Sequence, residues 1–113
     1  MQDLNVEIKR ADEKNLYSIA VLTKKYFPYA GFNFDEVLRR VNDPNVVYYA
    51  AVSNNHTVGY VDFEVKEDQI KILGLAVLKE LRGRGIGRML LRKAVVFAKK
   101  KKKSVCCKRK FAS

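Results

Sequence analysis

The chain has 113 residues, of which 48% are hydrophobic and 31% charged, and this composition suits one globular domain and excludes a disordered polymer. No apolar stretch approaches the ~20 residues that a membrane-spanning helix needs, so no membrane span is predicted. The net charge of +11 is uneven: residues 82–113 contain 13 Lys/Arg and no acid, whereas residues 1–81 contain 10 Lys/Arg and 12 Asp/Glu. Such a basic block favours anionic partners, either the phosphates of a small cofactor or nucleic acid.

The two cysteines, Cys106 and Cys107, are neighbours in the sequence and cannot link distant parts of a fold. They are therefore expected to be free thiols in a reducing compartment. The first residues have neither the basic nor the apolar region of a signal peptide. Together these features predict a cytoplasmic protein.

The first part of the chain predicts a strand and two helices. Alternating apolar residues indicate a half-buried strand near residues 4–8. Asp12 is placed to cap a helix that runs to about Phe27. Asn33, with Glu36 three residues later, resembles a capping box and opens a shorter helix. The inward residues are expected to be Leu16, Ile19, Ala20 and Thr23 in the first helix, and Phe34, Val37, Leu38 and Val41 in the second.

The second part of the chain predicts three antiparallel strands, a helix and a last strand. The strands are expected over 46–52, 57–66 and 70–78, separated by turns at 54–56 and 67–68. A polar loop over 79–84 precedes a helix over 86–102, and a final strand is expected over 104–110. The buried face of that helix is expected to hold Ile86, Met89, Leu90, Ala94, Phe97 and Ala98. The order β-α-α-β-β-β-α-β predicts an α/β fold with helices packed on a mixed sheet.

Three glycines at the start of this helix carry the strongest functional signal. Gly83, Gly85 and Gly87 lack Cβ atoms, so the backbone can turn tightly and approach a ligand. The helix that follows presents unpaired N–H groups and the positive end of its dipole. These features predict a phosphate cradle with three arginines at its rim, Arg82, Arg84 and Arg88. The alternative is a simple glycine-rich connection with solvated arginines, and three glycines in five residues favour the cradle.

Two other phosphate-binding motifs fail on spacing. A dinucleotide-binding fingerprint that starts at Gly83 or Gly85 needs a glycine at position 88 or 90, where the chain has Arg88 and Leu90. A Walker loop needs Lys and then Ser or Thr after its last glycine, and Gly87 is followed by arginine.

The segment Arg82-x-x-Gly85-x-Gly87, preceded by Leu-Gly-Leu-Ala-Val at 73–77, resembles the signature of the GNAT superfamily of N-acetyltransferases. The likeness is strongest to the ribosomal-protein and N-terminal acetyltransferase branch. It implies a GNAT fold over residues 1–113, acetyl-CoA as cosubstrate, no metal, and acetyl transfer to an amine. It also implies a CoA site made by Leu75, Ala76 and Val77 along the pantetheine arm, and by Arg82, Gly83, Arg84, Gly85, Ile86, Gly87 and Arg88 at the pyrophosphate. The N–H of Val77 would act as the oxyanion donor.

No catalytic residue is assigned. Lys71 stands where some members of the family have the glutamate that acts as the general base. The stretch 105–109, where other members have it, contains no acid. Asp62 and Glu64 are the remaining candidates for a base, and a solvent-facing position on a half-buried strand is the preferred interpretation of both. Weak or absent acetyl transfer is therefore expected. The acceptor is open between a protein N-terminus, a lysine and a small amine.

The resemblance also implies a helix and a hairpin after the last strand, and the sequence offers neither. We expect a chain that is truncated or frame-shifted near the five lysines at 99–103. An uncovered sheet edge there predicts a homodimer, with Lys108–Lys110 as partial protection against pairing.

Two rival functions remain from the sequence: a nucleic-acid-binding module that uses the basic C-terminal region, and a CoA-binding pseudoenzyme. Nucleic acid is disfavoured because most of the basic residues fit the phosphate site or a helix C-terminus. Four aromatic residues, Tyr26, Phe27, Tyr29 and Phe32, lie where the family often binds its acceptor, and packing is the preferred role. His56 is expected in a solvated turn, without a metal site.

Overall fold

The computed structural model describes residues 5–28, 33–107 and 111–112. Its helices and strands are β1 (Glu7–Arg10), α1 (Glu13–Tyr26), α2 (Phe34–Val41), β2 (Val46–Ser53), β3 (His56–Val65), β4 (Gln69–Val77), a 3-10 turn (Lys79–Leu81), α3 (Ile86–Lys100), β5 (Ser104–Cys107) and β6 (Phe111–Ala112). The predicted order of elements is confirmed, and β6 was not predicted. Tyr29, Phe32 and Lys108–Lys110 lie outside the described residues, as does Leu4, the first residue of the strand expected at 4–8.

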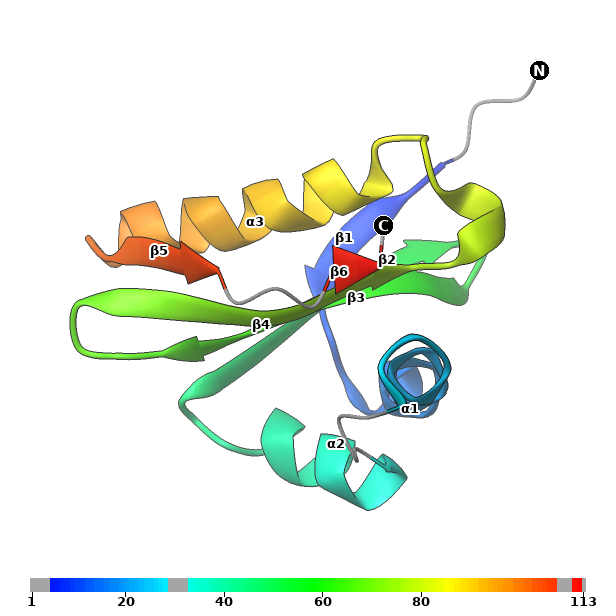
Figure 1. Cartoon of the computed structure of the whole chain (residues 1–113), viewed down its shortest axis with the longest axis horizontal. Coiled ribbons are helices and arrows are strands. Elements are labelled where there is room, and N and C mark those ends of the chain that lie inside the picture. The colour runs from blue at the N-terminus through cyan, green and yellow to red at the C-terminus, as the bar shows by residue number, and fades with distance from the viewer. Residues whose placement is uncertain (1–4, 29–32, 108–110, 113) are drawn as a thin grey trace.

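The strands form one mixed sheet in the order β1-β2-β3-β4-β5. Neighbours from β1 to β4 are antiparallel, and β5 is parallel to β4 because α3 carries the chain back across the sheet. The short strand β6 also pairs with β4, further along the same edge as β5. Helix α3 covers one face of the sheet, and α1 and α2 lie on the other (Figure 1).

Local signals set the helix starts. Asp12 caps α1: its side chain accepts a hydrogen bond from the Lys14 N–H, and the Asn15 side chain accepts one from the Asp12 N–H in return. Asn33 caps α2 by accepting a hydrogen bond from the Glu36 N–H. Asn54 and Asn55 both have positive φ, 51° and 65°, which joins β2 to β3 in a two-residue hairpin turn.

The core lies in two layers, one on each face of the sheet. Residues of β3, β4 and α3 that include Phe63, Ile72 and Leu90 fill one layer, and residues of α1, α2 and the sheet that include Ile19, Val37 and Tyr60 fill the other. Two predicted core positions are wrong. Phe34 is 43% exposed because it lies at the first position of α2, against the ring of Tyr17, and Met89 is 39% exposed on α3.

Candidate functional site

The loop between β4 and α3 forms an open cradle, and its backbone explains why. Gly83 and Gly85 have φ of +82° and +85°, values that residues with a Cβ rarely adopt. A Cβ at either position would meet nothing within 4 Å, so the space above both glycines is open. The sequence therefore places glycine where the turn requires positive φ and where close approach to the backbone is possible.

Helix α3 begins at this loop without a side-chain cap. Gly85 is the N-cap residue and has no side chain to accept the first N–H groups. The first intrahelical bond joins the Met89 N–H to the Gly85 carbonyl oxygen at 3.0 Å, which leaves the N–H groups from Gly85 to Arg88 without partners in the helix. These donors and the helix dipole favour an anion at this point.

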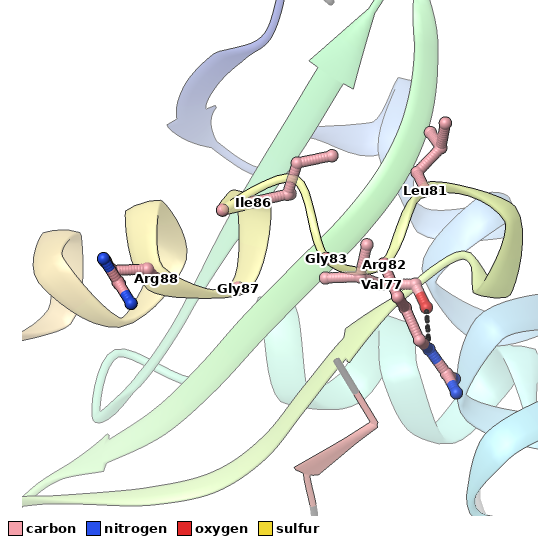
Figure 2. A pocket seen from close by; sticks show the side chains of 8 residues that line it. Val77, Leu81, Arg82, Gly83, Ile86, Gly87 and Arg88 are labelled. Carbon is pink, nitrogen blue, oxygen red and sulfur yellow. Dashed lines mark hydrogen bonds between the residues drawn. The ribbon is translucent and has the colours of Figure 1, made fainter.

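The cradle opens into a hollow of about 290 Å³. The residues that line it are Val77, Leu81, Arg82, Gly83, Gly85, Ile86, Gly87 and Arg88. Figure 2 shows how the end of β4 and the start of α3 meet around this hollow. Its volume fits a pyrophosphate group but not an entire CoA molecule, so a CoA bound here would extend beyond it. The hollow thus brings Val77, at the end of β4, together with the glycine loop and the start of α3, whereas Leu75 and Ala76 are not part of its lining.

The three arginines expected at the rim have different surroundings. Arg88 lines the hollow from the first turn of α3, and Arg84 is exposed on the loop and is not part of the lining. The guanidinium of Arg82 points toward α1 (Figure 2), where its central carbon lies 4.6 Å from the ring centroid of Tyr26. Its Nε donates a hydrogen bond to the Val77 carbonyl oxygen at 3.1 Å. Arg82 therefore holds the loop against the end of β4 and against α1.

Tyr26 strengthens this junction from the other side. Its hydroxyl accepts a hydrogen bond of 2.9 Å from the Lys79 N–H, just after β4. Tyr26 thus contacts both ends of the segment that leads from β4 to the cradle, through Lys79 and through Arg82. This role differs from simple core packing, and sequence patterns gave no signal for it.

The alternation of a β-strand determines which way the N–H and C=O of Val77 point at the C-terminal end of β4. The Leu78 N–H donates to the Val58 carbonyl oxygen of β3 at 2.9 Å. Because the polar groups of successive strand residues alternate between the two edges, both the N–H and the C=O of Val77 face away from β3. The bond from Arg82 to the Val77 carbonyl oxygen agrees with this direction. The Val77 N–H therefore lies on the outer edge of β4, beside the hollow.

The opposite face of the sheet holds a buried polar cluster made of Thr23, Arg40, Tyr48, Tyr60 and Asp62. Arg40 donates through Nη2 to the Asp62 carboxylate at 2.6 Å and through Nε to the Tyr48 hydroxyl at 3.0 Å. The Thr23 hydroxyl lies 2.8 Å from both the Ile19 carbonyl oxygen and the Tyr60 hydroxyl. Because a carbonyl only accepts, Thr23 donates to Ile19 and accepts from Tyr60.

The position of Asp62 corrects the solvent-facing interpretation. Asp62 is only 4% exposed, directly between Tyr48 on β2 and Gly74 on β4 in the register of the sheet. Its face of β3 is covered by α1 and α2, so alternation along the strand directs it inward. Glu64 is partly exposed and pairs with Lys66 at 3.3 Å. The cluster is thus a packed network whose partners satisfy one another.

Burial also changes how the cluster titrates. Burial raises the pKa of Tyr48 and of Tyr60, and the nearby Asp62 carboxylate raises both further. Burial opposes the charge of Arg40, and the adjacent Tyr48 and Asp62 outweigh this effect and raise its pKa. The tyrosines therefore stay neutral and Arg40 stays charged at neutral pH.

The hollow offers hydrogen-bond donors but no acid or base. Among the described residues that line it, none has a carboxylate, an imidazole or a thiol. Within residues 5–28, 33–107 and 111–112, no group of three or more His, Cys, Asp and Glu side chains could hold a metal ion. In the same part of the chain, no helix is both long and apolar enough to cross a membrane. What the site can supply is backbone N–H donors and positive charge, next to a strand edge that β6 occupies at Leu75 and Ala76.

Comparisons with known proteins agree with this geometry. The model of the acetyltransferase (GNAT) family matches residues 10–110, so the chain belongs to this family of N-acetyltransferases. No protein of curated function matches the chain in sequence.

Solved structures share the fold at low sequence identity. The aminoglycoside N-acetyltransferase AAC(6')-Iy, in complex with CoA, is 16% identical, with a TM-score of 0.82 over 96% of this chain and 79% of that chain. A ribosomal-protein-alanine N-acetyltransferase from Brucella melitensis is 16% identical, with a TM-score of 0.80 over 95% of this chain and 80% of that one. NAA60 of Arabidopsis thaliana, in complex with acetyl-CoA, is 18% identical, with a TM-score of 0.77 over 89% and 73%. At these identities the likeness establishes the fold, which is the GNAT fold that the sequence predicted.

Proposed function

We propose that this chain binds acetyl-CoA in the cradle and transfers the acetyl group to an amine, as one GNAT domain over residues 1–113. The observation that carries the proposal is the uncapped start of α3, where two glycines of positive φ open onto a hollow that reaches Val77. An anion at a helix start needs free N–H groups and room near the backbone, and this loop offers both.

Each segment of the site would bind a different part of the cosubstrate. The N–H groups from Gly83 to Arg88 would hold the pyrophosphate, with Arg88 adding charge at the same point. The backbone of Leu75, Ala76 and Val77 would pair with the pantetheine arm along the outer edge of β4. When bound, acetyl-CoA supplies an activated thioester. The Val77 N–H, which faces that edge, would stabilise the negative oxygen of the tetrahedral intermediate.

The reaction needs a neutral amine, and the described lining of the hollow has no base to produce one. The amine nitrogen forms a bond to the acetyl carbon, the carbon–sulfur bond breaks, and the proton lost by nitrogen is balanced by protonation of the thiolate. Without a base, only the fraction of acceptor that is already neutral in solution reacts. A positioned general base typically contributes about 100- to 10,000-fold, so turnover by this chain is expected to be slow.

The acceptor class follows from the same argument. An α-amine has a pKa of about 8 and a lysine ε-amine one of about 10.4. At pH 7 the neutral fraction of the α-amine is larger by about two orders of magnitude, so a peptide N-terminus is the preferred acceptor that we propose. An acetylation assay at pH 7 with a free-N-terminus peptide lacking lysine, against an N-terminally blocked peptide with one lysine, tests this. Equal rates on the two peptides would contradict it.

Calorimetric titration with CoA tests binding separately from chemistry. Binding without transfer to either peptide would make the chain a CoA-binding pseudoenzyme. The absence of CoA binding at millimolar concentration would refute the proposed function.

A nucleic-acid interface is the second candidate, and the block of 13 Lys/Arg in residues 82–113 favours it. Two of these charges have structural roles: Arg82 holds the loop against Val77 and Tyr26, and Lys103 donates to the carbonyl oxygens of Lys66 and Glu67 at the turn between β3 and β4. Titrating an oligonucleotide at increasing salt distinguishes the two functions, since binding to a phosphate backbone falls steeply with salt concentration.

Two further proposals concern the environment of the protein. The free thiol of Cys106 supports a reducing, cytoplasmic compartment.

A homodimer is proposed through the edge of β5 that faces away from β4, because an open strand edge is a template for pairing. Light scattering over a concentration series at moderate salt tests the homodimer.

A further inference from the structure

The outer edge of β4 is shared by two short strands. Strand β5 pairs with Gln69–Ile72, and β6 pairs with Leu75 and Ala76 further along, in the same parallel direction. Figure 1 shows β5 and β6 following β4 one after the other. Strand β6 consists of Phe111 and Ala112 alone. Strand β6 thus covers the part of β4 that leads directly to the cradle.

The register shows which backbone groups β6 engages. The carbonyl of Ala76 faces β3, since its oxygen would lie 2.8 Å from a Cβ built on Gly59. Ala76 therefore offers no polar group to the outer edge, and its parallel pairing with Ala112 must use the groups of its neighbours, Leu75 and Val77. Strand β6 is consequently placed against the Val77 N–H, at the border of the hollow.

The same edge is the one that the proposed function gives to pantetheine, so this inference rests on that proposal. The pantetheine arm is an extended chain with two amide groups, and it pairs with a strand edge in the manner of an added strand. The residues Leu75, Ala76 and Val77 have one outer edge, which cannot hold β6 and the arm together. A CoA whose pyrophosphate lies in the cradle would meet β6 at the end of β4.

We propose that β6 is a displaceable occupant of the CoA site, so that CoA binds to the form of the chain in which Phe111 and Ala112 have left β4. Two paired residues form few hydrogen bonds, and each contributes modestly to stability, so displacement is feasible. The apparent affinity for CoA is then lowered in proportion to the small fraction of chains in which the edge is free. Any change that detaches β6 increases CoA affinity without altering the cradle.

The test compares two substitutions at one position. Ala112→Pro removes the N–H that the pairing requires and places a ring at the β4 edge, whereas Ala112→Ser keeps the N–H. Calorimetry with CoA is expected to show binding to Ala112→Pro that is about tenfold tighter than to the wild type, which corresponds to the loss of one or two ordinary hydrogen bonds. Ala112→Ser is expected to bind as the wild type does.

The outcomes separate the two proposals. Equal affinity of wild type and Ala112→Pro overturns the displacement of β6 and leaves the CoA site intact. Weaker binding by Ala112→Pro overturns it too, because β6 would then contribute to the site. No binding by any of the three proteins refutes the proposed function, and the displacement with it.

Hydrogen exchange on the unmodified chain gives an independent test that does not depend on how the variants fold. Saturating CoA is expected to increase deuterium uptake in the peptide that contains residues 111–112, while it decreases uptake in the peptide that contains Gly83–Arg88. Decreased uptake in both peptides would overturn the displacement and would support the CoA site. No change in either peptide would refute both.

Discussion

The cradle and the buried polar cluster lie at opposite faces of one sheet and use polar groups in opposite ways. In the cluster, Arg40, Asp62 and their partners satisfy one another inside the core. In the cradle, the N–H groups at the start of α3 have no side-chain cap and face open space. Satisfied buried groups stabilise a fold, whereas accessible and unsatisfied ones are available to a ligand. We therefore expect substitutions in the cluster to reduce stability, and substitutions in the cradle to reduce binding.

The largest effect is expected from Asp62→Ala. This change leaves the charge of Arg40 in a site where only 11% of its side chain is exposed. Removing one partner of a buried ion pair typically costs about 3–5 kcal/mol, which is a large share of the stability of a small domain. Urea unfolding measures the loss, and the double variant Arg40→Met/Asp62→Ala is the control, which should recover part of it. An Asp62→Ala protein as stable as the wild type would show that the pair is not strongly coupled.

Gly74→Ala is expected to destabilise the same cluster by about 1–3 kcal/mol, the usual cost of overpacking. A Cβ at Gly74 would lie 2.8 Å from Oδ1 of Asp62, and Arg40 holds that carboxylate in place. In the Asp62→Ala background the added methyl group should cost almost nothing, because the clashing atom is gone. If Gly74→Ala is as destabilising in the Asp62→Ala background as in the wild type, the clash with Asp62 is not the source of the strain.

Stability is expected to fall above about pH 10, where tyrosines ionise in the unfolded chain. The pKa values of Tyr48 and Tyr60 are raised in the folded protein, so the folded chain keeps protons that the unfolded chain loses. The free energy of unfolding then decreases as pH rises, by up to about 1.4 kcal/mol per pH unit for each tyrosine. Urea unfolding between pH 9 and 11 measures this. Tyr60→Phe should show a shallower decrease, and an identical slope would exclude Tyr60 as a source.

The smallest of these effects is expected at Arg82, which links the cradle to α1. Arg82→Lys removes the donor to the Val77 carbonyl oxygen and the planar group over Tyr26. We expect a loss of about 1 kcal/mol in CoA binding, seen as an approximately fivefold weaker Kd, because the end of β4 is no longer held. Arg92→Lys, an exposed change on α3, is the matched control. If Arg82→Lys and Arg92→Lys bind CoA with equal affinity, Arg82 does not position the CoA site.

Sequence reasoning succeeded where the signal is local. The caps at Asp12 and Asn33, the turn at Asn54–Asn55 and the tight backbone turn at Gly83 and Gly85 depend on residues within a few positions of one another. Each is dictated by the conformational needs of a short segment, so one sequence is enough to find it.

Sequence reasoning failed where the structure depends on contacts between residues that are far apart in the chain. The burial of Asp62 follows from α1 and α2 covering that face of β3, and its partner Arg40 is 22 residues away. Alternation along β3 shows that Tyr60 and Asp62 share a face but not which face is covered. The pairing of β6 with β4 joins residues that are far apart in sequence, and two residues are too few for a periodic signal. Phe34 and Met89 were placed inward by helical spacing alone, which does not show where the apolar stripe ends.

The most direct test of the cradle is calorimetric titration of CoA into the wild type and the Gly85→Val variant. Gly85 has φ of +85° and open space at its Cβ position, so valine would strain the loop by about 1–3 kcal/mol and intrude where the pyrophosphate would lie. We expect the wild type to bind CoA and Gly85→Val to bind at least about a hundredfold more weakly, because the strained loop would no longer present its N–H groups to the pyrophosphate and the valine side chain would occupy the space beside them. Asp62→Asn, on the other face of the sheet, is the control: it should lose stability but bind CoA normally at a temperature where it is folded. Normal CoA binding by a folded Gly85→Val protein would contradict the account.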